Sequence, residues 1–175
     1  GNLRVISPSA KGGKWTIFEF EFVFLIINSA KFLIENSIAP PILITSFNNL
    51  IRKIKGKKSI YTNATFKHAK NILKSMGIFQ EFEIIFDIKD ANYIAKPDPN
   101  SYHMMKKKLN LNDKNISKSI FFEDTAKNLK PARELGMSTV WIENDFNRKE
   151  ADRLREYINF TGSDIKSILN NMLKF

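Results

Sequence analysis

The sequence predicts an α/β protein: a doubly wound, three-layer α/β/α architecture built around a parallel sheet. Two observations support this fold class. Downstream of residue 45, short apolar runs alternate with helical patterns of about ten residues. Polar residues follow several of these apolar runs, and glycines close several of the helical patterns. Such alternation is typical of βαβ units, in which helices cover both faces of a parallel sheet. We expect one domain, because 175 residues are enough to bury a single core.

The predicted elements follow one another along the chain. Apolar residues at i, i+3, i+4 and i+7 from Phe47 to Ile54 predict a helix over Ser46–Lys55. Similar apolar patterns predict four further helices: Phe66–Met76, Pro99–Leu109, Ala126–Leu135 and Ser163–Leu173. Proline starts the second of these, and glycine follows the first and the third. Short apolar runs rich in β-branched and aromatic residues predict five strands: Ser59–Tyr61, Ile84–Phe86, Ser119–Phe122, Ser138–Ile142 and Tyr157–Phe160.

The N-terminal part of the chain has a different character. We separate residues 1–45, an atypical N-terminal segment, from residues 46–175, the core of the fold. Trp15–Ile27 is rich in aromatic and β-branched residues and predicts a strand, with Glu19 and Glu21 on one of its faces. Ala30–Ile38 predicts a helix that Pro40 and Pro41 end.

Composition excludes several kinds of chemistry. Cysteine is absent, which excludes disulfides, cysteine-ligated zinc and cysteine nucleophiles. The two histidines, His68 and His103, are too few for a histidine-rich metal site. Metal chemistry must therefore use carboxylates, which favour a hard cation such as magnesium.

The net charge of +10 raises the question of a polyanionic partner. The 22 lysines outnumber the 6 arginines and are scattered over the whole chain, so we expect a solvated basic surface and no nucleic-acid partner. No run of 18 apolar residues exists, so we expect no membrane span. A cytoplasmic location is the expectation, because the N-terminal apolar run lacks a signal-type cleavage site. The oligomeric state is left open.

Polar and charged side chains follow or lie within the predicted strands at four places. In an open parallel sheet, functional groups gather at the carboxyl ends of the strands. Together these residues supply a hydroxyl, a fixed cation and several carboxylates, the groups needed for magnesium-assisted phosphoryl transfer. They are Glu19 and Glu21, Thr62 and Asn63, Lys96, and Glu123 and Asp124.

Each of these residues, taken singly, also has a purely structural interpretation. Thr62 is suited to the start of a turn, and Lys96 is one of many lysines with access to solvent. Glu123 and Asp124 precede a predicted helix, whose N-terminal dipole favours acidic side chains. The interpretation as a site rests on their order and spacing.

Three motifs occur in order at strand ends. Residues 60–64 are Ile-Tyr-Thr-Asn-Ala, residues 96–99 are Lys-Pro-Asp-Pro, and residues 121–129 are Phe-Phe-Glu-Asp-Thr-Ala-Lys-Asn-Leu. In this order and spacing they resemble the haloacid dehalogenase-like hydrolase superfamily, and most closely its pyrimidine 5′-nucleotidase branch. The resemblance runs continuously over about Phe47–Ile142.

The resemblance implies roles for the individual residues. It implies that Thr62, with Asn63, binds the transferring phosphoryl group and that Lys96 neutralises its charge. It implies that Glu123 and Asp124 hold Mg²⁺ directly or through water. The fold implied is the family's Rossmann-like core, and the implied substrate is a small, nucleotide-like phosphorylated molecule.

The sequence departs from the family at its first motif. Catalysts of the family open with D-x-D-x-[TV], in which the first aspartate attacks phosphorus and the second is the general acid and base. The nearest match is Phe18–Val23, in which Glu19 and Glu21 would be the catalytic pair and Glu19 would also be a metal ligand. The added methylene of glutamate displaces each carboxylate, which costs on the order of 100-fold in rate. The alternative is that both glutamates form the solvent face of a strand.

The interval from Glu19 to Thr62 leaves no room for a helical cap, so we expect the cap to be absent or truncated. Residues 1–45 are then either a degenerate first strand or sequence foreign to the family. Two functions follow. The first is a Mg²⁺-dependent phosphomonoester hydrolase of nucleotidase type with impaired activity. The second is a catalytically inactive relative, or a fragment, that retains phosphate and metal binding. The resemblance favours the enzyme.

Overall fold

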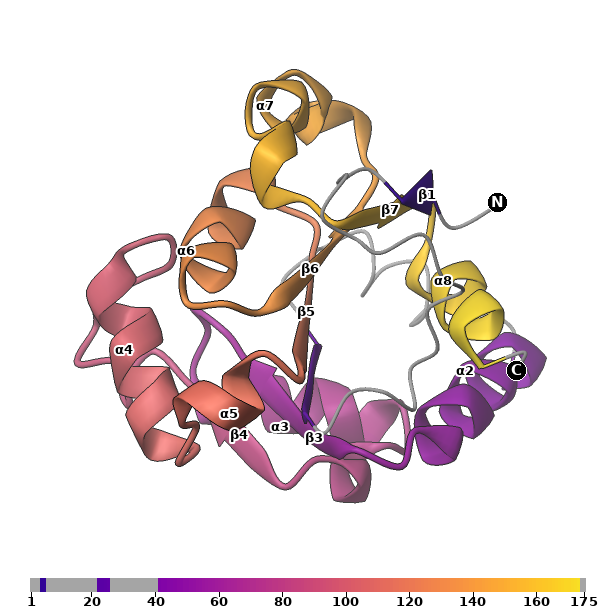
Figure 1. Ribbon diagram of the computed structural model, residues 1–175. Helices are drawn as coiled ribbons and strands as arrows, with labels where there is room; N and C mark the ends of the chain where they lie inside the picture. Colours follow the sequence, from indigo (N-terminus) through magenta and orange to yellow (C-terminus); the bar gives the residue numbers. More distant parts are fainter. Residues whose placement is uncertain (1–3, 6–21, 26–40, 174–175) are drawn as a thin grey trace.

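The computed structural model describes residues 4–5, 22–25 and 41–173, which form one sheet with helices on both faces (Figure 1). The sheet has seven strands in the order β1-β7-β6-β5-β2-β3-β4. Strands β2 to β7 are parallel to their neighbours, and β1 pairs antiparallel with β7. The strands are β1 (Arg4–Val5), β2 (Phe22–Leu25), β3 (Lys57–Tyr61), β4 (Ile84–Phe86), β5 (Ser119–Glu123), β6 (Ser138–Ile142) and β7 (Phe160–Gly162).

The helices alternate with these strands, as a doubly wound fold requires. The longer α-helices of the described residues are α2 (Pro41–Lys53), α3 (Phe66–Ser75), α4 (Pro99–Lys108), α6 (Leu129–Glu134), α7 (Arg148–Arg153) and α8 (Ile165–Met172). The single turn α5 (Asp113–Ile116) and the 3₁₀ turns η2 (Phe79–Glu81), η3 (Ala126–Asn128), η4 (Asp145–Asn147) and η5 (Arg155–Tyr157) join them. Local capping fixes several starts: Asp98, for example, accepts a bond from the backbone N–H of Asn100 at 2.9 Å.

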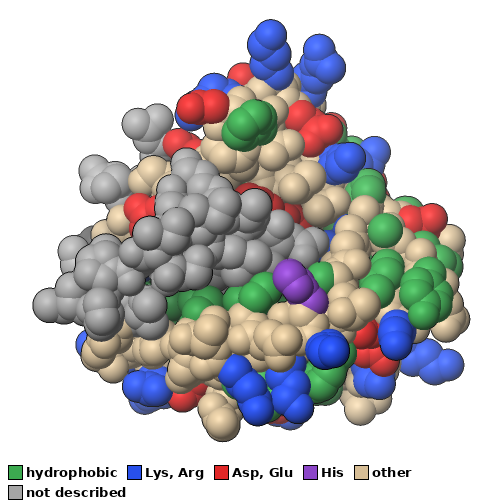
Figure 2. Space-filling model, turned by 180° about the vertical axis from the view of Figure 1, so that it is seen from behind, with side chains coloured by type: hydrophobic (Ala, Val, Ile, Leu, Met, Phe, Trp, Pro, Cys, Tyr) green, Lys and Arg blue, Asp and Glu red, His purple; other side chains and the backbone are tan. Residues whose placement is uncertain are grey.

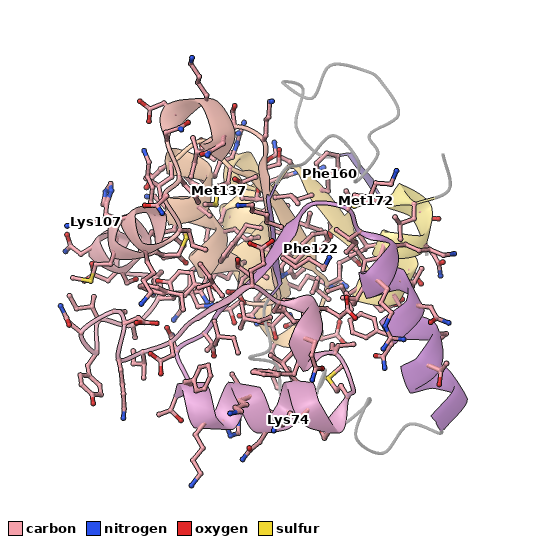
Figure 3. All side chains as sticks on the ribbon, turned by 90° about the horizontal axis from the view of Figure 1, so that it is seen from below. Lys74, Lys107, Phe122, Met137, Phe160 and Met172 are labelled. Carbon is pink, nitrogen blue, oxygen red and sulfur yellow. The ribbon has the colours of Figure 1, made fainter. Side chains whose placement is uncertain are left out.

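Residue alternation along the strands sends side chains into two separate cores. One face of the sheet, with Ile60, Phe122 and Val140, packs against α2, α3 and α8. The opposite face, with Tyr61 and Phe121, packs against α4, α5, α6 and α7. Figure 3 shows the same division, with Met137 on the α6 side of the sheet and Phe160 and Met172 on the α8 side. The predicted three-layer α/β/α architecture is confirmed.

Strands β4 and β6 coincide with the predicted segments, but other boundaries differ. The helix predicted from Ser46 begins at Pro41, because the fixed φ and missing N–H of proline suit the first turn of a helix. The helix predicted over Ala126–Leu135 is divided into η3 and α6. The strand predicted over Tyr157–Phe160 was wrong in register: residues 155–157 form η5, and β7 begins at Phe160, where it pairs with Val140 of β6.

The N-terminal predictions fall largely outside the described residues. Of the strand predicted over Trp15–Ile27, the described part is β2, which lies between β3 and β5 in the sheet. Glu19, Glu21 and the helix predicted over Ala30–Ile38 lie outside the described residues. Helix α2 begins ahead of the boundary predicted at residue 45, and β2 shares the sheet with the later strands.

The surface carries basic residues without a single concentrated stripe in the view of Figure 2, where lysine and arginine side chains are interspersed with acidic, apolar and other polar side chains. Among the described helices, none combines the length and apolar character needed to cross a bilayer.

Candidate functional site

The candidate site lies at the carboxyl edge of the sheet, where β3 and β5 end. Thr62 and Asn63 follow Tyr61, the last residue of β3. Glu123 is the last residue of β5, and Asp124 follows it. Strand β2 lies between β3 and β5 and is parallel to both, so these residues emerge at the same edge, as expected for a fold of this class.

Lys96 reaches this edge from the loop between β4 and α4. Its ammonium nitrogen Nζ lies 3.1 Å from Oε2 of Glu123 and 3.1 Å from the backbone oxygen of Tyr61. Both charged side chains are fully buried. Nζ also lies 4.8 Å from the ring centroid of Tyr61 and 5.8 Å from that of Phe121. A charge in such surroundings is stable only with a close counter-charge and hydrogen bonds, and Glu123 supplies the counter-charge.

The carboxylate of Glu123 is the centre of this cluster. Its Oε1 accepts the backbone N–H groups of Asp124 and Thr125, each at 3.1 Å. Its Oε2 accepts Lys96 Nζ and, at 3.0 Å, the side-chain amide Nδ2 of Asn128. Burial raises the pKa of Glu123 to about 7, although the Lys96 ammonium and the Thr125 N–H oppose the shift; the neighbouring Asp124 carboxyl adds to it.

Asn63 contacts the backbone of Lys96 at both ends of its side-chain amide. Oδ1 accepts the Lys96 N–H at 2.8 Å, and Nδ2 donates to the Lys96 carbonyl at 3.3 Å. The side chain of Asn63, which was predicted to bind phosphate, therefore holds the backbone of Lys96. Thr62 is buried, and its Oγ1 accepts the Ala64 N–H at 3.0 Å.

Asp124 is half-buried, and its backbone is anchored to the following strand. Its carbonyl oxygen accepts Nε1 of Trp141 at 3.0 Å and Nδ2 of Asn144 at 2.7 Å. One carboxylate oxygen accepts Thr125 Oγ1 at 3.4 Å. This anchoring holds Asp124 at the carboxyl end of β5, beside the Glu123 cluster.

The described residues do not by themselves form a magnesium site. Among them, no group of three histidine, aspartate or glutamate side chains is arranged to hold a metal ion. Both oxygens of Glu123 are already occupied by four protein donors, so Asp124 is the carboxylate with capacity left. Magnesium at this site stays a prediction, with Asp124 as the candidate ligand.

The structure thus brings together Thr62, Asn63, Lys96, Glu123 and Asp124, which span more than sixty positions in the sequence. His68 is exposed, and Tyr102 and Met105 are buried in the core. Asn128 was not predicted as a site residue, although it lies within the motif of residues 121–129.

Comparison with known proteins identifies the family. Residues 25–136 match the haloacid dehalogenase-like hydrolase family. This match covers more than half of the chain, and the chain belongs to that family. The superfamily expected from the three motifs is confirmed, whereas its nucleotidase branch is not resolved by this match.

Solved structures with a similar fold include L-2-haloacid dehalogenase from Xanthobacter autotrophicus, with 14% identity, a TM-score of 0.54, and coverage of 70% of this chain and 58% of that one. A second dehalogenase has 19% identity and a TM-score of 0.61, covering 81% and 60%. β-Phosphoglucomutase from Clostridium difficile has 22% identity and a TM-score of 0.51, covering 74% and 54%. The chain therefore spans less than two thirds of these proteins' lengths, and the likeness is one of fold.

Proposed function

We propose that this domain binds the phosphoryl group of a small, nucleotide-like phosphomonoester and acts as a phosphatase of nucleotidase type. The observation that carries the proposal is the buried ammonium group of Lys96 beside the carboxyl end of β3. Among the described residues, its three N–H bonds have the acceptors Tyr61 O and Glu123 Oε2, and we assign the third N–H to a phosphoryl oxygen. Fixed donors of this kind stabilise the charge that develops in phosphoryl transfer.

A haloacid substrate is the competing proposal within the family, because the similar folds include dehalogenases. The motif containing Thr62 and Asn63, and the acidic motif at Glu123 and Asp124, favour the phosphatase through their resemblance to the nucleotidase branch. The location proposed for such an enzyme is the cytoplasm, and its proposed cofactor is Mg²⁺.

A second candidate, a relative that binds phosphate without hydrolysing it, is favoured by the direction of β2. Phe22 is level with Lys57 and Ser119, the first residues of β3 and β5, and Leu25 is level with Ile60 near the carboxyl edge. Glu21 precedes Phe22 in the sequence, and residues 26–34, which follow Leu25, contain no aspartate or glutamate. The stretch that follows β2 therefore contains no carboxylate that could act as the nucleophile at the carboxyl edge.

The test measures binding and turnover separately. Calorimetry with inorganic phosphate and with uridine monophosphate reports binding, and release of phosphate or chloride from an aryl phosphate or 2-chloropropionate reports turnover. We expect phosphate binding that Lys96→Ala abolishes. Turnover of the phosphate ester supports the enzyme, and binding without turnover supports the second candidate. Chloride release, or phosphate binding that survives in Lys96→Ala, would overturn the proposal.

Two further variants sharpen this test. Glu19→Asp combined with Glu21→Asp raises phosphatase activity if the two glutamates occupy the first-motif positions, and leaves it unchanged in the non-hydrolytic relative. Magnesium binds weakly on this proposal, because Asp124 is the one described carboxylate of the cluster with capacity left. Asp124→Ala should remove the heat of magnesium binding, and a heat that is unchanged in this variant would exclude Asp124 as a ligand.

A further inference from the structure

Two buried asparagines stand out from the other polar residues. Among the described residues, the buried side-chain atoms with no hydrogen-bond partner are Oδ1 of Asn48 and Oδ1 of Asn128. Leaving a buried carbonyl oxygen unpaired is costly, so any favourable contribution of each amide comes from the hydrogen bond that its Nδ2 donates. Nδ2 of Asn48 donates to the carbonyl of Met76 at 2.6 Å and ties α2 to the end of α3. Nδ2 of Asn128 donates to Oε2 of Glu123 at 3.0 Å, in the candidate site.

The backbone of Asn128 is held in place independently of its side chain. The hydroxyl group of Tyr102 donates to the Asn128 carbonyl at 2.7 Å, and Tyr102 is fully buried between α4 and the sheet. Asn128 itself is 6% exposed and is the last residue of η3. Its amide therefore approaches Glu123 from a rigid base, which is what positioning a flexible glutamate requires.

Oε2 of Glu123 accepts hydrogen bonds from both Asn128 and Lys96. Backbone N–H groups fix Oε1 of Glu123, but Oε2 is oriented by two side chains, Nδ2 of Asn128 and Nζ of Lys96. Nζ of Lys96 also donates to the Tyr61 carbonyl at 3.1 Å, but it ends a long and flexible side chain, so the direction of its bond to Glu123 follows the position of Oε2. The donor that sets the direction of Oε2 is then the amide of Asn128.

We propose that Asn128 is a positioning residue that, by holding Oε2 of Glu123, places Nζ of Lys96 for phosphate. The inference deepens the proposed function and rests on it. It requires an amide at position 128, because only a donor satisfies Oε2 and because Lys96 and Glu123 already balance each other's charge. A carboxylate at position 128 would oppose an acceptor with an acceptor and add an unpaired negative charge to a buried cluster.

Asn48 provides a matched control for the experiment. Asn128→Asp and Asn48→Asp each replace one buried donating Nδ2 by an oxygen in a side chain of equal size, so both should lower the melting temperature. Affinity for inorganic phosphate is measured by calorimetry. We expect about a tenfold loss in Asn128→Asp, the scale of one hydrogen bond to a charged group, and less than a twofold change in Asn48→Asp.

A second readout does not depend on phosphate or turnover. The ¹⁵N signal of the buried Lys96 ammonium group, assigned by its loss in Lys96→Arg, reports the ion pair directly. It should shift or broaden in Asn128→Asp and stay in place in Asn48→Asp. If the wild-type chain binds no phosphate, the proposed function fails, while this signal still decides the role of Asn128.

Asn128→Ala and Asn48→Ala repeat the comparison without adding charge, and they replace the aspartate variants where those do not fold. A Lys96 signal and a phosphate affinity that respond equally at positions 48 and 128 would overturn the proposal, because Asn128 would then act through stability alone. Rescue of both readouts by Asn128→Gln, relative to Asn128→Ala, would support it, because glutamine restores the donor.

Discussion

Two buried acids lie at the carboxyl edge of the sheet: Asp87 after β4 and Glu123 at the end of β5. Their carboxylates are stabilised by different kinds of hydrogen-bond donor. Asp87 is 4% exposed, and its donors among the described residues are the backbone N–H groups of Phe66 at 2.7 Å and of Lys89 and Asp90 at 2.9 Å each. Glu123 is fully buried and accepts two backbone N–H groups, one amide and one ammonium group.

The different donors indicate a structural role for Asp87 and a functional role for Glu123. Asp87 follows β4, and its carboxylate accepts the N–H of Phe66, the first residue of α3, where the helix dipole favours an acid; it thereby joins that helix to the loop after β4. The donors to Asp87 are backbone N–H groups, whose positions are determined by the fold. Glu123 depends on Lys96, a side-chain ammonium group with three N–H donors, one of which we assign to a ligand. A buried acid paired with a side-chain cation is therefore the stronger indication of a functional site.

The largest effect is expected from removing the cation of the Glu123 cluster. Lys96→Met keeps the volume of the side chain but removes the counter-charge of Glu123, whose carboxyl group must then either stay ionised and unpaired or take up a proton. Because protonation at neutral pH relieves part of the cost, we expect the free energy of unfolding to fall by at most about 3–5 kcal/mol, measured by urea denaturation. Combining Lys96→Met with Glu123→Gln removes both charges and should recover most of this loss. A double variant as unstable as Lys96→Met would show that packing, rather than charge, is responsible.

A smaller effect is expected from pH. The pKa of Glu123 is about 7 in the folded protein, against 4.5 as its ordinary value. Between these pH values the folded state binds more protons than the unfolded state, so the contribution of Glu123 to stability falls as pH rises from about 4.5 to about 7. The upper bound of this change is about 3 kcal/mol.

Urea denaturation across this pH range checks the effect, with Glu123→Gln as the control. The pH-dependent part of the free energy that is assigned to Glu123 should disappear in the variant. An identical pH profile in the wild type and in Glu123→Gln would mean that Glu123 keeps an ordinary pKa, and the contrast with Asp87 would lose its electrostatic basis.

The smallest effect is expected from Asp87. Asp87→Ala removes three hydrogen bonds to backbone N–H groups, which remain able to reach solvent or reorganise at a helix start and a loop. We expect a loss of about 2 kcal/mol in stability and a phosphate affinity within twofold of the wild type. A loss of phosphate affinity comparable to that of Lys96→Ala would place Asp87 in the functional cluster and remove the distinction between the two acids.

The sequence predicted most elements of the fold because their signals are local. Ile84–Phe86 and Ser138–Ile142 were predicted at their observed bounds, since each is a short apolar run closed by polar residues. Gly77 and Gly136 follow α3 and α6 with φ of +69° and +97°, a backbone region in which glycine is favoured. Strand β7 was misplaced because its register depends on β6: Asn159, inside the predicted strand, instead binds Thr139 through its side chain.

By itself the sequence determined the fold class, the order of the elements and the three motifs that place Thr62, Lys96 and Glu123 at one edge of the sheet. Periodicity and strand–helix alternation depend on residues that are close in the sequence. Parallel strands bring their carboxyl ends to one edge of the sheet in any such fold. Only the tertiary structure decided which polar groups contact each other. Asn63 holds the backbone of Lys96, and Asn128 and Lys96 both donate to Oε2 of Glu123. The partner of a buried polar atom is chosen by which donors lie within about 3 Å after packing, and no local pattern encodes that distance.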